Sequence, residues 1–129
     1  MSFVTTLATD SKTIDAPTWD DVERAVRALD GSTETLVTLA PHQGEHHLAI
    51  GGGRGGQFIV YLTEDNLTFF NLAEPAAHDD RTPVRMLIGG QEGEYRKGQF
   101  VSLDVVLRAA RHYVQEGGRA PGLTWVEQR

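Results

Sequence analysis

The segment with the most recognisable chemistry is the glycine cluster Gly51–Gly56, which contains the spacing of the dinucleotide-binding motif G-x-G-x-x-G. That motif binds a pyrophosphate because a strand leads into a helix whose N-terminal amides face the ligand. Here the next residues, Gln57–Tyr61, favour a strand, and no Lys-Ser or Lys-Thr pair completes a P-loop. We therefore predict a flexible hairpin connection. A small-molecule or nucleotide-binding module built on this turn is the alternative function.

Three histidines, His42, His46 and His47, lie in one short segment beside Glu45. Imidazole and carboxylate groups are zinc ligands, so this spacing raises the hypothesis of a metal-dependent enzyme. A metal centre also needs a rigid frame that fixes its ligands, and a Pro-His-Gln-Gly-Glu-His-His turn offers little rigidity. We therefore predict a solvated loop here, with no metal and no cofactor.

Nucleophilic catalysis has no recognisable residues in this chain. The sequence contains no cysteine and no G-x-S-x-G elbow, and Ser102 is accounted for as the N-cap of a helix. The adjacent acids Asp20–Asp21 and Asp79–Asp80 are interpreted as solvated or helix-terminal groups rather than as a glycosidase pair. We expect no catalytic residues, and hence a protein that is not an enzyme.

Acidic loops with one tyrosine form the strongest candidate for a binding surface. Aromatic side chains anchor protein interfaces, and carboxylates steer association and pair with Arg or Lys. The alternative interpretation is that these loops are acidic simply because the whole protein is acidic. The candidate residues, in order of preference, are Glu92, Glu94, Tyr95, Asp79, Asp80 and Glu74.

The composition is that of a globular protein of one domain, spanning residues 1–129. Eighteen acids face 12 Lys and Arg, giving a net charge of −6, which argues against direct contact with nucleic acid. The apolar runs fall far short of the roughly 20 residues of a membrane span, and the N-terminus lacks the pattern of a signal peptide. We expect a cytoplasmic protein with no membrane contact.

Two amphipathic helices are predicted to position these loops. The first begins after Thr18, with acids in its first turn, and ends at Gly31. The second begins after Ser102, carries a continuous apolar stripe, and ends at Gly117.

Short strands joined by tight turns predict an antiparallel meander. Strands are expected at 35–39, 47–50, 58–62, 67–72, 84–88 and 123–126, with a short edge strand at 3–7. The segments 10–17 and 91–98 are expected to be a connector and a polar loop. The fold class is therefore α+β, a mostly antiparallel sheet of about five to seven strands packed against two helices. Trp19 is expected to be half-buried, and the predicted core comprises Val60, Leu62, Phe70, Val106, Leu107, Leu123 and Trp125.

The ordered set of these features resembles the Imm1 family of immunity proteins over nearly the full length. The features that carry this resemblance are the first helix, Leu36–Leu39, Leu48–Gly51, Ile59–Tyr61, Gly89-Gly90, the helix opened by Val101-Ser102, Tyr113, and the closing Leu123–Trp125.

The resemblance implies a non-enzymatic protein that binds and neutralises a cognate bacterial toxin. The toxins of such polymorphic systems are typically nucleic-acid deaminases, whose zinc-containing pocket receives a base through a basic groove. An acidic inhibitor can fill that groove as a phosphate mimic. The implied partner is therefore the toxin domain itself, and the acidic residues named above are our candidates for contacting it.

Overall fold

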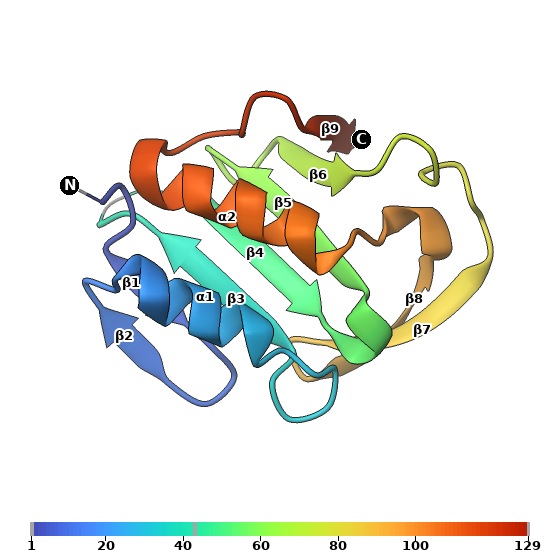
Figure 1. Cartoon of the computed structure of the whole chain (residues 1–129), viewed down its shortest axis with the longest axis horizontal. Coiled ribbons are helices and arrows are strands. Elements are labelled where there is room, and N and C mark those ends of the chain that lie inside the picture. The colour runs from blue at the N-terminus through green and yellow to red at the C-terminus, as the bar shows by residue number, and fades with distance from the viewer. Residues whose placement is uncertain (1, 43, 129) are drawn as a thin grey trace.

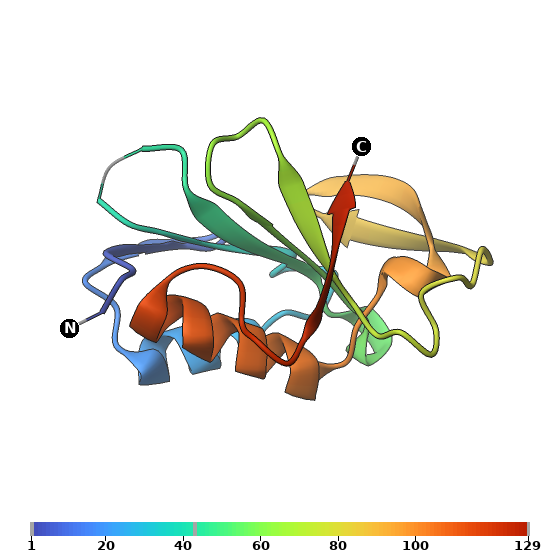
Figure 2. The ribbon, with the colours of Figure 1, turned by 90° about the horizontal axis from the view of Figure 1, so that it is seen from above.

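The computed structural model describes residues 2–42 and 44–128. Its main element is a seven-stranded antiparallel sheet in the order β2-β1-β3-β4-β5-β6-β9, and a separate hairpin pairs β7 with β8. Figures 1 and 2 show both helices on the same face of the large sheet. The helices are α1 (Trp19–Arg27) and α2 (Leu103–Glu116), with short 3-10 turns η1 (Arg54–Gly56) and η2 (Lys97–Gln99). The strands are β1 (Thr6–Ala8), β2 (Thr13–Asp15), β3 (Leu36–Ala40), β4 (His47–Gly52), β5 (Phe58–Thr63), β6 (Phe69–Ala73), β7 (Pro83–Ile88), β8 (Gln91–Arg96) and β9 (Thr124–Gln128).

This architecture confirms the predicted α+β fold class. The strand pattern differs from the prediction in two segments. Residues 10–17 contain β2, which forms one edge of the sheet, so β1 is flanked on both sides. The segment 91–98, expected as a polar loop, forms β8 and η2 because its backbone pairs with β7 from Ile88↔Gln91 to Pro83↔Arg96.

The first helix begins where the sequence predicts it. Thr18 and Asp21 form a reciprocal capping box, which satisfies two backbone amides at the helix start. The buried residues Val22 and Val26 are four apart and face the sheet. The helix ends at Arg27, earlier than the expected stop at Gly31.

Ser102 occupies the N-cap position of α2, but its side chain makes no capping bond to the helix. Its hydroxyl instead donates to Glu74 Oε1, at 2.8 Å. The helix end is as predicted, because Gly117 adopts a φ of 72°.

The hydrophobic core lies between the sheet and the two helices. Of the predicted core, Val60, Leu62 and Val106 are fully buried. The other four are only half-buried: Phe70, Leu107, Leu123 and Trp125. Trp125 belongs to β9, whose outer edge pairs with no strand among the described residues, and its indole donates to Ala120 O at 3.2 Å. Trp19 is half-buried, as expected.

A buried hydroxyl links the β7–β8 turn to the sheet. Thr35, 1 % exposed, donates to Asp10 Oδ2 and accepts from the Gly90 amide at 3.0 Å. Burial raises the pKa of Asp10, but hydrogen bonds from Thr35 and Leu36 outweigh it and hold this pKa below 3.8. Asp10 is therefore ionised at neutral pH and accepts these bonds as a carboxylate.

No helix among the described residues is both long and apolar enough to cross a membrane.

Replacing Thr35 with valine should destabilise the protein and loosen the hairpin turn. The substitution removes the hydroxyl bonded to Asp10 Oδ2 and leaves the Gly90 amide without this acceptor, which costs about 1–3 kcal/mol of unfolding free energy. Urea unfolding measures the loss, and amide hydrogen exchange at Gly90 should accelerate. Thr38→Val in β3, three residues further on, is the matched control, and an equal effect of both changes would contradict the assigned role of the Thr35 hydroxyl.

Candidate functional site

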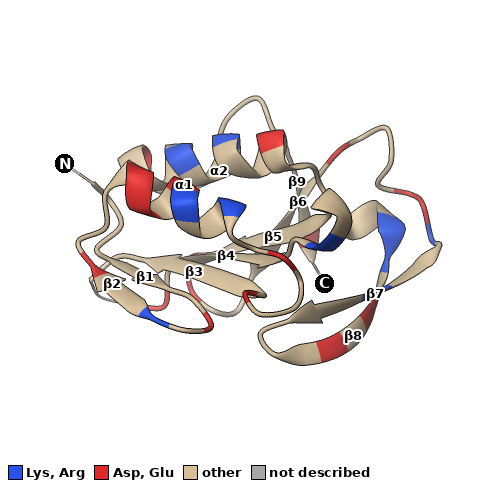
Figure 3. Ribbon diagram, turned by 60° about the horizontal axis from the view of Figure 1, so that its bottom comes forward, with Lys and Arg blue, Asp and Glu red and all other residues tan. Residues whose placement is uncertain are grey.

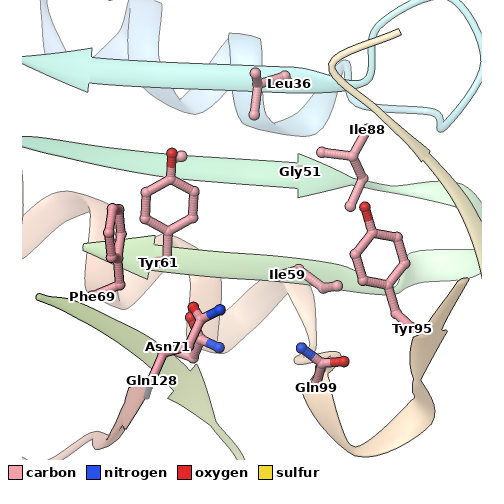
Figure 4. A pocket seen from close by; sticks show the side chains of 11 residues that line it. Leu36, Gly51, Ile59, Tyr61, Phe69, Asn71, Ile88, Tyr95, Gln99 and Gln128 are labelled. Atoms are coloured by element: carbon pink, nitrogen blue, oxygen red, sulfur yellow. The ribbon is translucent and has the colours of Figure 1, made fainter. Parts of the chain in front are cut away.

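The face of the sheet that the helices leave uncovered carries a groove of about 380 Å³. Alternating residues of β3 to β6 point to this face, while their neighbours enter the core. Figure 4 shows the groove from this side, with the β7–β8 hairpin along one end. Its lining residues are Leu36, Ala49, Gly51, Ile59, Tyr61, Phe69, Asn71, Ile88, Tyr95, Gln99 and Gln128.

The hairpin forms a wall of the groove because two glycines admit its side chains. A Cβ on Gly51 would lie 2.6 Å from Ile88 Cγ2, so only glycine lets Ile88 approach β4 this closely. A Cβ on Gly93 would lie 2.9 Å from Tyr95 Oη, so Tyr95 can lie along its own strand. The Tyr95 ring also meets Phe100 edge to face, with centroids 6.1 Å apart.

The opposite end of the groove is aromatic. Tyr61 meets both His47 and Phe69 edge to face, each with centroids 5.5 Å apart. His47 Nδ1 lies 2.9 Å from the carbonyl oxygen of Glu45, so Nδ1 carries the proton and donates it. Nε2 is then an acceptor for the Tyr61 hydroxyl, at 3.1 Å. Because Tyr61 donates its only proton to His47, its oxygen offers the groove an acceptor.

Burial raises the pKa of the Tyr61 phenol above its usual 10.0, so the hydroxyl stays protonated at neutral pH.

The groove itself is uncharged. None of its lining residues is Asp, Glu, Lys or Arg, and the sequences of β3, β4, β5 and β6 contain no charged residue at all. Strands β3 to β5 accordingly lack both charge colours in Figure 3. The polar groups that remain are the Tyr hydroxyls and the amides of Asn71, Gln99 and Gln128.

The exposed large apolar side chains lie next to this groove. Leu67 is 84 % exposed and Val126 is 41 % exposed. Leu67 lies in the β5–β6 turn, where Asp65 accepts from the amides of Leu67 and Thr68 and so fixes the loop. Val126 pairs with Asn71 in the sheet and shares its face. Apolar surface rimmed by polar groups is typical of a protein-binding site.

Three of the predicted site residues lie on β8, but on different faces. Tyr95 points into the groove, whereas Glu92 and Glu94 lie on the outer face of the hairpin. Arg85 lies on this outer face too, opposite Glu94 in the register and 3.8 Å from Glu92 Oε1.

The other three predicted residues lie between β6 and β7. Asp79 is fully exposed, with only His78 beside it at 3.5 Å. Asp80 accepts from the amide of Thr82 at 3.0 Å and stabilises its own loop. Glu74 accepts from Ser102, so its carboxylate ties this loop to the start of α2.

Residues 74–99, which contain all six predicted site residues, carry little net charge. Residues 74–99 contain five acids and four bases, whereas residues 1–73 contain ten acids and four bases. The predicted acids therefore lie among cations, and most of the net charge of −6 comes from the first half of the chain.

The histidines do not converge. Among the described residues, no three His, Cys, Asp or Glu side chains gather into a group that could hold a metal ion. His42 is exposed and His47 bonds to Tyr61. His46 bonds to Tyr113 Oη at 2.7 Å and meets the ring of Phe3 edge to face. The prediction of a solvated loop is thus wrong for His46, because Tyr113 reaches it from α2.

The glycine cluster is the hairpin connection that the sequence predicts. Strands β4 and β5 pair antiparallel up to Gly52↔Phe58, and η1 is a turn of three residues. Gly53 has a φ of 106°, and a Cβ there would lie 2.4 Å from the Leu29 carbonyl oxygen. The turn packs against the end of α1 and lacks the helix N-terminus that dinucleotide binding requires.

Sequence reasoning did not identify the groove. Strand β5 is apolar on both faces and central in the sheet, but Ile59 and Tyr61 on one face are half-buried and line the groove. The available signal was the run of strands without a single charge, on an otherwise acidic chain.

The fold and the groove define a two-layer α+β protein whose open sheet face carries an uncharged groove. Residues 10–127 match the family described as Immunity protein Imm1. Because the match covers most of the 129 residues, the chain belongs to the Imm1 immunity protein family. Membership indicates a toxin-neutralising immunity function and a toxin protein as partner. No curated protein matches the chain.

The environment of His46 predicts a pH-dependent stability. Burial lowers the pKa of His46 below its usual 6.5, while Glu64 opposes this and His47 adds to it. The unfolded chain therefore binds the proton more readily, so the free energy of unfolding should fall as the pH drops through about 6.5. Urea unfolding at pH 7.5 and 5.5 measures this loss.

The variant His46→Gln should reduce this pH dependence, and His42→Gln is the control at an exposed position of the same segment. An unchanged dependence in His46→Gln would show that another group causes it.

Proposed function

We propose that this immunity protein neutralises a nucleic-acid deaminase toxin by covering the cleft through which the toxin receives its base. The open sheet face supplies the contact surface, with the groove at its centre. The observation that carries this proposal is that the uncharged groove and the exposed Val126 share one sheet face. The β5–β6 turn, which contains the exposed Leu67, also lies on the side away from the helices (Figure 2). The other side of the sheet is occupied by the helices.

Inhibition of this kind requires no reaction. A deaminase must admit a single-stranded or flipped base to a zinc-activated water, so any protein seated over that entrance excludes the substrate. A stable interface buries roughly 800 Å² on each partner, which is more than one groove supplies. The rim of the groove must therefore take part, including the β7–β8 hairpin and the β5–β6 turn.

The predicted site residues receive distinct roles in this proposal. Tyr95 is a wall of the groove and contacts the partner directly. Glu92 and Glu94 lie outside the groove, where they act on the approach of a basic partner and remain hydrated in the complex. Asp79 and Asp80 extend the same rim along the neighbouring loop. Glu74 holds that loop against Ser102 and so positions the others.

The net charge of −6 supports a basic partner surface. A cleft that binds nucleic acid is lined by Lys and Arg, which attract an acidic inhibitor over several ångströms and accelerate its association. This contribution weakens with salt, because the screening length falls from about 10 Å at 0.1 M to about 3 Å at 1 M.

The double variant Glu92→Lys plus Glu94→Lys should bind the toxin encoded by the neighbouring gene more slowly, with little loss of stability. Reversing two rim charges lowers the association rate roughly tenfold at low salt. Surface plasmon resonance at two salt concentrations measures this rate, and co-expression in bacteria measures protection.

The matched control is Asp20→Lys plus Glu116→Lys, which makes the same change of charge on the helix layer. An equal effect of both pairs would indicate that net charge alone matters and that the hairpin is not the rim. Absence of any complex between the wild-type protein and the toxin, together with absence of protection, would contradict the proposed function itself.

A further inference from the structure

We propose that the groove binds an arginine side chain of the toxin, laid across Tyr61 and Phe69 with its guanidinium donating to Tyr61 Oη. This inference rests on the proposed function, because it names the group of the partner that fills the centre of the contact surface. It assigns one residue type to the groove, whereas the proposed function requires only that the surface be covered.

The hydrogen-bond roles at Tyr61 select a donor. His47 donates from Nδ1 to the Glu45 carbonyl oxygen and accepts at Nε2 from Tyr61, at 2.9 and 3.1 Å. The Tyr61 oxygen therefore has lone pairs to offer and no proton to give. A carboxylate, a carbonyl or a phosphate needs a donor, and the Tyr61 hydroxyl offers it none. A guanidinium carries five N–H donors and no acceptor, which matches this oxygen.

The shape and composition of the groove select a cation with a long apolar stem. Aliphatic side chains such as Ile59 and Leu36 line it together with the rings of Tyr61 and Phe69, and its volume is about 380 Å³. Methylene groups of an arginine can pack on this apolar floor, while its planar head stacks on an aromatic face. The protein already uses this stacking on its helix side, where the Arg119 guanidinium lies 3.9 Å from the centre of the Phe70 ring.

The charges around the aromatic end favour a cation as well. The β3–β4 loop contributes Glu45, and the β5–β6 turn contributes Glu64 and Asp65. Between Arg27 and Arg81 the sequence contains one Lys or Arg, Arg54, which bonds to the Gly31 carbonyl oxygen beside the helices. The described residues of these two loops thus carry acids and no Lys or Arg, which favours an arginine over a nucleic-acid phosphate.

The direct test is an NMR titration of the isotope-labelled, full-length protein with acetyl-Gly-Arg-Gly-amide. The control peptide carries citrulline in place of arginine, which keeps the shape and removes the charge. We expect the arginine peptide to shift resonances of Tyr61, Phe69 and Asn71 with a Kd on the order of 1–10 mM, because it supplies only one anchor of an interface. The citrulline peptide should bind at least about tenfold more weakly.

Two variants locate the bound peptide. Tyr61→Phe keeps the ring and removes the acceptor, so binding should weaken roughly tenfold. Phe69→Leu keeps the bulk and removes the stacking face, with a similar loss. Asp20→Asn plus Glu116→Gln removes two exposed acids from the helix layer and should leave peptide binding within twofold. Thermal unfolding of each variant establishes that it is folded.

Three results would overturn the inference. Equal binding of the arginine and citrulline peptides would show an apolar groove without preference for a cation. Loss of binding in the helix-layer variant with retention in Tyr61→Phe would place the peptide outside the groove. No shift at Tyr61 or Phe69 at 20 mM peptide, roughly twice the upper Kd expected here, would show that the groove does not take arginine.

The toxin complex separates this inference from the proposed function. If the inference is right, Tyr61→Phe and Phe69→Leu also weaken binding of the toxin, and one arginine of the toxin shows the matching loss when changed to lysine or alanine. If both variants bind the toxin like the wild type, the arginine site is wrong while neutralisation stands. If the wild type forms no complex, the proposed function is wrong regardless of the peptide result.

Discussion

The hydroxyl of Thr35 joins three segments that are distant in the sequence, and the groove depends on it. It donates to Asp10 in the β1–β2 turn and accepts from Gly90 in the β7–β8 turn. Because Thr35 is buried, water competes little for either bond. With the turn fixed here and Ile88 seated on Gly51, the hairpin stands over one end of the sheet. The β7–β8 hairpin thus forms one wall of the groove on the open face of the sheet.

Strands β3 to β6 contribute to both the core and the groove, because successive side chains of a strand point to opposite faces of the sheet. In β5, Val60 and Leu62 enter the core beneath the helices, while Ile59 and Tyr61 line the groove. A change on one face is therefore felt on the other through the backbone of one strand. The close-packed core on the helix side therefore holds the groove in a defined shape without a second layer of helices.

The sequence was sufficient for elements set by local rules and insufficient for those set by pairing. Thr18 with Asp21, followed by Val22 and Val26, predicts α1 because capping and helical spacing are local properties. Strand β8 carries Gly93 and two outward acids, so it has no apolar alternation, and it forms only because β7 lies beside it. Periodicity also cannot tell which face of β5 the helices will cover. The groove therefore cannot be predicted from periodicity. Charge alone selects Glu74 as a contact residue, whereas its carboxylate accepts a hydrogen bond from Ser102.

Charged residues and the uncharged groove have different roles in the proposed binding. The acids accelerate association with the toxin, and the groove forms the contact. Most of the net negative charge belongs to residues 1–73, whereas the groove lining carries none. A carboxylate buried against the toxin would have to lose its hydration, and that loss can cancel the attraction it provides. Acids that stay hydrated still act over a screening length of about 10 Å at 0.1 M salt, so they can accelerate association without that penalty. A neutral centre with an acidic surround is therefore the better arrangement for binding a basic cleft, and it allows one partner cation to be desolvated against aromatic rings and a single phenolic oxygen.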